Sequence, residues 1–368
     1  MRIICNKQAL YEALVNVSKA AADKSTIPAL EGVRIKLADS TLMLTGYDLE
    51  IGINTFIPAV SSDSGEFVVN SRLFSDIIRK MPADEIEIEV SDNLSVTISS
   101  GQTHLSINAL SAQEYPAIPE LGDGEAIKLS QGVLKSLISE TVFAVSTNDT
   151  KPILKGELFE ITGNKLNVVA IDGFRLAVRT ESIKHDGDLK FIVPSKTLQE
   201  VSRLLKDEDG ETCEIRVTKK QVVFDFSGYT VFSRLLEGEF HNYRGSIPQN
   251  SVTEVIISKR ELIDCLDRAS LLINERIKNP VKCLFDSGSL KVNCQTSIGK
   301  INDEIAADVT GPKIEIGFNC KFLLDPLKVI KDEKLKLLMN GGNLPMKIVP
   351  LDGEEYTYLV LPVRLRSE

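Results

Sequence analysis

The sequence of 368 residues lacks the local patterns that mark most catalytic sites. It contains no GxGxxG or GxxxxGK phosphate loop, and its three histidines are too dispersed to indicate a metal site or the general base of a nucleophile. Its six cysteines form no CxxC pair, so we interpret them as core thiols and not as ligands or disulfide partners. These absences argue against an enzyme, and we expect no cofactor and no bound metal.

Long apolar runs and an excess of positive charge are missing as well. No stretch approaches the roughly 18 apolar residues of a membrane span, and residues 1–5 predict a strand instead of a signal peptide. We therefore expect a cytoplasmic protein with no membrane partner. Lys and Arg number 43 against 52 Asp and Glu, and the resulting net charge of −9 would ordinarily be repelled by nucleic acid.

One pattern is present three times along the chain. Apolar residues recur at helical spacing over residues 134–145, behind Ser130 as a plausible N-cap, and the same stripe occurs 124 residues earlier and 128 residues later. A second helix and a strand repeat with it. The second helix is predicted at 69–82, 193–206 and 318–331, and the strand at 42–48, 166–172 and 290–296. We therefore predict one module written three times, with domains at 1–121, 122–249 and 250–368.

The segments between the predicted helices favour antiparallel sheets. They alternate apolar and polar residues with a period of two, and Asp, Asn, Ser or Gly separates one segment from the next. Each module is then a helix followed by a meander, twice, which is the α+β class. Residues 357–365 are predicted to form an apolar strand that is paired or serves as a docking surface. Asp48 and Asp172 recur, but the third copy has Thr296, so a turn explains them better than a catalytic acid.

Charge is segregated within the repeat. Each of the three second-helix segments carries a net charge of +2, so the remainder of the chain carries −15. Basic residues commonly occupy solvated helix faces, and this ordinary explanation remains open. Because the feature occurs three times, it also predicts a positive surface that is repeated around a symmetric body and faces a polyanion.

Several motifs resemble one known family. Asp-Gly-Phe-Arg-Leu-Ala-Val at 172–178 and Leu-Pro-Val-Arg-Leu at 361–365 are the most specific, and segments 27–30, 193–196 and 240–244 agree with them. The whole chain resembles, in register, the bacterial DNA polymerase III beta subunits, which are sliding clamps. The resemblance implies a non-catalytic processivity factor: a head-to-tail homodimer whose six modules form a ring around duplex DNA, with helices lining the hole. Phosphate contacts alone position a protein without specifying sequence, which suits sliding.

The resemblance also implies partners and contact residues. The partners are duplex DNA, the DNA polymerase III catalytic subunit, the clamp loader, and other polymerases and repair proteins that carry short linear motifs. Family positions that touch DNA correspond to Lys24, Asn148 and Lys151. Our additions from the charge pattern are Arg72, Arg79, Lys196, Arg203, Lys321 and Lys328. For ring closure, Leu105 and Ile107 match an apolar edge strand, and Leu271 and Leu272 match the helix end on which it packs.

A hydrophobic groove between modules two and three is the family's peptide site. It corresponds to Leu154, Asp172, Gly173, Arg175, Leu176, His241, Arg244, Leu359, Leu361, Pro362, Val363, Arg364 and Leu365. His241 replaces a common proline and Gly245 a common arginine, so we expect an altered peptide preference. Two alternatives remain open. Leu176, Leu359 and Leu361 are ordinary core in one, and in the other the chain is a three-module interaction scaffold that never encloses DNA.

Overall fold

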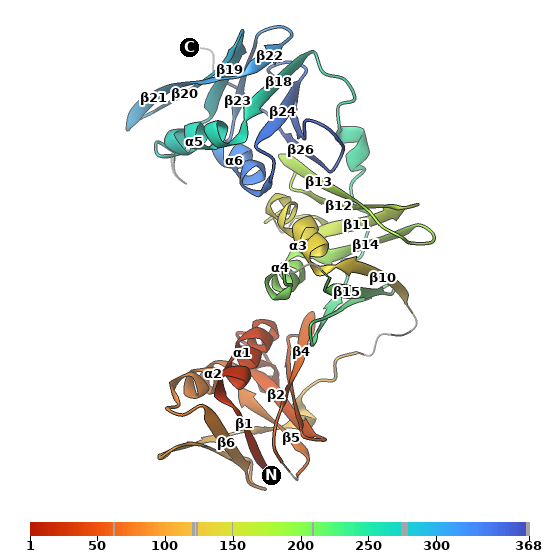
Figure 1. Cartoon of the computed structure of the whole chain (residues 1–368), viewed down its shortest axis with the longest axis vertical. Helices are drawn as coiled ribbons and strands as arrows, with labels where there is room; N and C mark the ends of the chain where they lie inside the picture. The colour runs from red at the N-terminus through yellow and green to blue at the C-terminus, as the bar shows by residue number, and fades with distance from the viewer. Residues whose placement is uncertain are drawn as a thin grey trace. The chain divides into compact units, whose positions relative to one another are not determined.

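The computed structural model describes residues 1–61, 63–119, 122, 124–148, 150–207, 210–273 and 279–365. Its contacts divide the chain into two compact units, each made of two pieces of sequence. Unit 1 comprises Met1–Lys135 and Glu200–Leu235, and unit 2 comprises Ser136–Gln199 and Leu236–Glu368. The division passes through the two helices of the central predicted module. Figure 1 labels the elements along the chain, from red at the N-terminus to blue at the C-terminus.

Unit 1 contains two antiparallel sheets. The smaller has the order β1-β6-β7-β8, with bounds Arg2–Asn6, Glu85–Val90, Ser95–Ser100 and Thr103–Asn108. The larger has the order β10-β15-β16-β17-β4-β3-β2-β5-β9. Its bounds in that order are Glu125–Ser130, Thr212–Val217, Gln221–Phe226, Tyr229–Arg234, Ile51–Pro58, Thr41–Tyr47, Gly32–Ala38, Gly65–Asn70 and Leu110–Ser111. Because β17 pairs with β4, this sheet joins strands of the first and second predicted modules.

Unit 2 repeats this arrangement with the second and third modules. Its larger sheet has the order β14-β11-β12-β13-β26-β25-β24-β18-β22. The bounds in that order are Leu189–Pro194, Gly156–Thr162, Lys165–Ile171, Arg175–Ser182, Tyr356–Val360, Met346–Val349, Lys334–Met339, Thr253–Ser258 and Asp308–Thr310. The smaller has the order β21-β20-β19-β23, with bounds Gly299–Ala306, Ser289–Thr296, Val281–Asp286 and Ile314–Phe318. Pairing of β13 with β26 joins the two modules.

The described residues form six α-helices, two for each predicted module. They are α1 (Lys7–Val17), α2 (Ser71–Lys80), α3 (Gln131–Ser139), α4 (Ser195–Leu204), α5 (Lys259–Ser270) and α6 (Cys320–Val329). α1 packs against α2 and against β3 and β4, while α5 packs against α6 and against β20 and β21 (Figure 1). Ser130 caps α3 as predicted, since its hydroxyl accepts a hydrogen bond of 3.2 Å from the N–H of Val133.

The first helix of the second module is shorter than predicted. α3 ends at Ser139, and Val142–Ala144 forms a separate 3₁₀ turn, so the prediction of one helix over 134–145 was wrong at its C-terminal end. The backbone leaves helical geometry at Thr141, where φ is −127° and the N–H donates to Ile138 O, three residues back. α1 likewise stops at Val17 and continues as a 3₁₀ turn, Ser18–Ala20.

The strand predicted over 357–365 is also shorter, because β26 ends at Val360. Pro362 has no N–H to donate to a ladder. The flanking N–H groups go elsewhere: that of Leu361 donates to Phe174 O at 2.9 Å and that of Val363 to Gly317 O at 2.8 Å. The C-terminal segment therefore leaves the large sheet and runs beside β23.

Buried side chains include every cysteine. All six are free and buried, which confirms that they are core thiols, and four of them lie in one large cluster of unit 2: Cys265, Cys283, Cys294 and Cys320. Burial raises the pKa of the Cys265 and Cys320 thiols to about 12, so neither is a reactive thiolate. Among the described residues, no helix has the length and apolar character needed to cross a bilayer.

Candidate functional site

The turn between β12 and β13 supplies the first groove residues. The carboxylate of Asp172 accepts hydrogen bonds through Oδ1 from the N–H groups of Phe174, at 2.9 Å, and Arg175, at 3.0 Å. Gly173 between them has φ +90°, a left-handed conformation that glycine adopts without steric cost. This agrees with the turn predicted for Asp172 and Gly173.

Arg175 connects this turn to α6. Its guanidinium donates through Nε to Asp172 Oδ2 at 2.9 Å and through Nη1 to Asp325 Oδ2, and it lies 4.6 Å over the ring of Phe322. Only 8% of Arg175 is exposed, so the ion pairs are largely desolvated. Phe174 is 61% exposed and stacks on Phe322 with ring centroids 6.0 Å apart. An exposed aromatic side chain therefore stands beside a fixed cation.

Apolar residues form the base of this region. Leu176 and Leu359 face each other as Cα partners across β13 and β26, and both are buried. They belong to one cluster, which we call the outer cluster: Leu158, Val169, Leu176, Val178, Ile192, Tyr243 and Leu359. Leu154 is buried in the 3₁₀ turn Pro152–Lys155, whereas Leu361 is 37% exposed. The alternative interpretation, in which these leucines are ordinary core residues, therefore describes the packing of Leu176 and Leu359 but not that of Leu361.

Residues 236–247 belong to unit 2 and are held against the outer cluster by Glu160 of β11. Glu160 on β11 accepts hydrogen bonds from Tyr243 Oη at 2.7 Å and forms ion pairs with Arg244 Nη1 at 2.6 Å and Lys190 Nζ at 2.6 Å. Burial alone would raise the pKa of Glu160, but these donors and the charge of Arg244 outweigh it and hold the pKa below its ordinary value. His241 is exposed, with Nε2 3.4 Å from Ser246 Oγ.

The C-terminal segment, residues 361–365, also belongs to the groove region. Leu361 and Val363 are exposed to similar extents, Pro362 and Leu365 are half-buried, and Arg364 is exposed. A Cβ at Gly317 of β23 would lie 2.7 Å from Val363 O, so only glycine lets the segment approach this closely. Residues 362–365 line a surface recess of about 620 Å³ together with Glu315, Gly342 and Asn343.

The residues predicted to face DNA are all exposed. They are Lys24, Arg72, Arg79, Asn148, Lys151, Lys196, Arg203, Lys321 and Lys328, of which the six charge-based candidates lie on α2, α4 and α6. Arg79 pairs with Asp76 at 2.7 Å, and Arg203 pairs with Glu200 at 2.8 Å, each one turn back on its own helix. These pairs reduce the positive field of the helices without neutralising it.

The four predicted interface residues lie on one edge strand and at one helix end. Leu105, 37% exposed, and Ile107 belong to β8, which is the last strand of its sheet and pairs with β7 alone among the described strands. Leu271, 80% exposed, and Leu272 follow the end of α5. β21, an edge strand of the small sheet in unit 2, begins at Gly299, where a Cβ would lie 3.3 Å from the side chain of Leu272.

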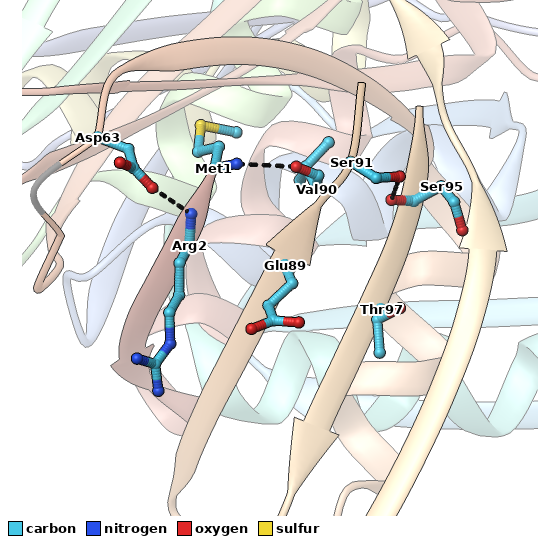
Figure 2. Close-up of a pocket in the computed structure, with 8 residues that line it drawn as sticks. All are labelled: Met1, Arg2, Asp63, Glu89, Val90, Ser91, Ser95 and Thr97. Carbon is cyan, nitrogen blue, oxygen red and sulfur yellow. Dashed lines mark hydrogen bonds between the residues drawn. The ribbon is translucent and has the colours of Figure 1, made fainter. Parts of the chain in front are cut away.

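A second hollow, of about 300 Å³, lies at the start of β1 (Figure 2). Its polar groups hold the chain terminus: the Met1 ammonium donates to Val90 O at 2.8 Å, and Asp63 Oδ2 accepts from the N–H of Arg2 at 2.7 Å. Ser91 and Ser95 are likewise hydrogen-bonded to each other (Figure 2). These bonds give the hollow a structural role.

Sequence reasoning missed several residues of the groove region. Phe174, Phe322 and Tyr243 carry its aromatic contacts, and Glu160 carries its buried carboxylate. Asp325 on α6 is another such residue, since it forms an ion pair with Arg175. No local pattern points to these contacts, because the partners are far apart in the chain.

Comparison with known proteins identifies one family over the three modules of the chain. Family models of the DNA polymerase III beta subunit match residues 1–119 (N-terminal domain), 128–242 (central domain) and 244–364 (C-terminal domain). The chain is 36% identical over 377 residues to the beta sliding clamp of Bacillus subtilis (strain 168), covering 99% of this chain and 100% of that protein. It is 36% identical over 381 residues to the beta sliding clamp of Halalkalibacterium halodurans, with the same coverage.

A solved structure supports the same family assignment. The crystal structure of the DNA polymerase sliding clamp from Bacillus subtilis matches with a TM-score of 0.96 and 34% sequence identity, covering 100% of both chains. The predicted fold, α+β with three repeated modules of helices and antiparallel sheets, is thereby confirmed. The chain belongs to the family of DNA polymerase III beta subunits, the beta sliding clamps.

Proposed function

We propose that two copies of this chain close head to tail into a ring that encircles duplex DNA, slides along it and tethers a DNA polymerase. The observation that carries the proposal is the match to beta sliding clamps along the full length of the chain. As a member of this family, the chain is a non-catalytic subunit of a polymerase holoenzyme. It therefore raises processivity by holding the polymerase on DNA and performs no chemistry itself.

The charge distribution supports a DNA-facing role for the helices. The chain carries −9 overall, yet the second helices are basic in all three modules and their candidate contacts are exposed. Lys24, Asn148 and Lys151 add exposed donors in loops. Side chains of this kind bind phosphate oxygens irrespective of sequence, so the ring could move along DNA without pausing at particular sites.

The two open strand edges support ring closure. An edge strand leaves unpaired N–H and C=O groups, and an exposed apolar side chain such as Leu105 adds to the tendency to associate. We propose that β8 of one chain pairs with β21 of another, with Ile107 and Leu105 packed on Leu271 and Leu272. A head-to-tail contact between two three-module chains closes after two copies, which removes both edges.

The groove region supports binding of short peptides. Its apolar base, its exposed Phe174 and Leu361, and the cations Arg175 and Arg244 provide anchors and polar groups of the kind that hold linear motifs. We propose that the DNA polymerase III catalytic subunit, the clamp loader, other polymerases and repair proteins bind here in turn. With His241 and Gly245 in place of proline and arginine, the preferred peptide should differ from that of most relatives.

The domain division 1–121, 122–249 and 250–368 remains part of the proposal. The order and approximate extent of the three family matches support it, although Leu121, at the first boundary, lies outside the described residues. The alternative is a scaffold of three modules that binds peptides but does not enclose DNA.

Sedimentation analysis of the purified chain tests the assembly. We expect a dimer with twice the 40.5 kDa mass of the chain, and only a small fraction of monomer at working concentrations. A protein that remains monomeric at those concentrations would exclude a two-chain ring and favour the scaffold.

A further inference from the structure

We propose that Glu160 is a positioning residue of the peptide groove, which holds the guanidinium of Arg244 so that it can bind a carbonyl or carboxylate oxygen of a partner peptide. Glu160 belongs to neither the motifs nor the positions that mark the groove in the sequence. The inference rests on the proposed function, because it assigns a part to Glu160 in that same site.

The geometry around Glu160 uses both carboxylate oxygens. Oε2 accepts a hydrogen bond from Tyr243 Oη at 2.7 Å and forms an ion pair with Arg244 Nη1 at 2.6 Å, while Oε1 forms an ion pair with Lys190 Nζ at 2.6 Å. Glu160 itself is 1% exposed, whereas the side chains of Arg244 and Lys190 are 53% and 63% exposed. The carboxylate thus lies beneath the surface, and the two cations reach from it into solvent.

These contacts fix Arg244 in two directions. Its guanidinium carbon lies 5.0 Å from the centre of the Tyr243 ring, and that ring is packed in the outer cluster with Leu176 and Leu359. The ion pair holds Nη1, and the guanidinium carbon lies over the Tyr243 ring. Within the described chain, Nη1 is the nitrogen of Arg244 that forms an ion pair, which leaves Nε and Nη2 as donors. Such a fixed planar fork suits an oxygen acceptor on an extended peptide.

The same contacts explain why the effect should appear in binding more than in folding. β11 is hydrogen-bonded on both sides, to β12 and to β14, so its backbone does not depend on the Glu160 side chain. If the charge of Glu160 is removed, Arg244 and Lys190 can be solvated where they stand because both are more than half exposed. What is lost is the orientation of the Tyr243–Ser246 turn and of Arg244.

A double-mutant cycle on the full-length protein tests the proposal. The affinity of a labelled peptide of the Gln-Leu-x-Leu-Phe type is measured by fluorescence polarisation for wild type, Glu160→Gln, Arg244→Ala and the double variant. We expect each single variant to lose about 10-fold in affinity, the scale of one charge-assisted hydrogen bond, and the double variant to lose no more than either. Lys190→Ala is the matched control: it removes a cation from the same carboxylate but not from the groove, and it should bind within about twofold of wild type.

Two results would overturn the proposal: wild-type affinity in a folded, dimeric Glu160→Gln protein, or losses of about 100-fold in the double variant, which would make the two residues independent. If Glu160→Gln fails to fold, Tyr243→Phe removes one donor from the same carboxylate and carries the same test in the Arg244→Ala background. Absence of peptide binding by wild type would instead contradict the proposed function itself.

Discussion

Replacing Glu157 by glutamine should stabilise the protein at neutral pH and change its stability little in mild acid. Glu157 lies on β11 and is completely buried. Its Oε2 is 2.6 Å from the hydroxyl of Thr141, which also lies 2.7 Å from Leu137 O, and its Oε1 has no hydrogen-bond partner within the described residues. Burial raises the pKa of Glu157 to about 8, and the hydrogen bond of Thr141 offsets only part of that effect.

The sign and size of the effect follow from the two ends of the titration. An unfolded glutamate loses its proton near pH 4.5, whereas the folded protein keeps it until about pH 8. The folded state therefore loses stability as the pH rises between these values, at 1.36 kcal/mol per pH unit. At pH 7 the accumulated loss is about 3 kcal/mol, which is an upper limit if the surroundings relax. Glutamine has the same shape and does not titrate, so the variant avoids this loss.

Thermal melts of wild type and Glu157→Gln at pH 5 and pH 7 provide the test. We expect the variant to melt at a higher temperature by only roughly 1–3 °C at pH 5 but by roughly 6–12 °C at pH 7, for a cooperative unit of this size. Glu237→Gln, which removes an exposed carboxylate from the same unit, is the control and should shift the midpoint little at either pH. An equal shift at both pH values, or a lower midpoint for Glu157→Gln at pH 7, would refute the reasoning.

Two further predictions concern binding surfaces. Deletion of 364–368, of which 366–368 lie outside the described residues, should abolish binding of a Gln-Leu-x-Leu-Phe type peptide in fluorescence polarisation, because it removes the side chain of Leu365 that packs at Gly317. Unchanged affinity in a folded dimer would exclude this segment from the groove. Ile107→Asp combined with Leu272→Asp should give a folded monomer, since unpaired carboxylates buried at the closing edge cost several kcal/mol. Sedimentation measures this, and a persistent dimer would place the interface elsewhere.

The positions of the second helices were largely predictable from the sequence. The segments 69–82, 193–206 and 318–331 contain α2, α4 and α6, because apolar residues at helical spacing bury one face whatever the rest of the fold. Helix ends were less accurate. The stripe continues through Val142 in module two, but the Thr141 backbone turns there, and a 3₁₀ turn presents nearly the same apolar face as a helix.

The pairing of modules was not predictable from periodicity. Strands β4 and β17, and likewise β13 and β26, join edges of adjacent modules into sheets of nine strands. Alternation shows that a strand has a buried face, but it does not show which edge will be its neighbour. The repeat marks units of sequence, whereas the sheets continue from one module into the next.

The groove was predictable only where its contacts are local in the sequence. Asp172, Gly173 and Arg175 stand in one short turn whose hydrogen bonds are local, so their spacing carries the information. The contacts of Glu160 with Tyr243 and of Arg175 with Asp325 join residues separated by 83 and 150 positions. Such pairs depend on how the strands and helices pack, and each residue alone resembles an ordinary polar side chain.

The central claim is that the protein holds DNA by enclosing it. With a net charge of −9 and only scattered basic residues proposed to face phosphate, direct affinity for a duplex should be weak and should fall steeply with salt. The decisive measurement is gel filtration of labelled protein, loaded by its clamp loader on nicked circular plasmid, at salt that removes ordinary phosphate-binding proteins. We predict that the protein elutes with the circle and is released once a nuclease makes the DNA linear. Equal retention on circular and linear DNA would contradict the ring and favour the open scaffold.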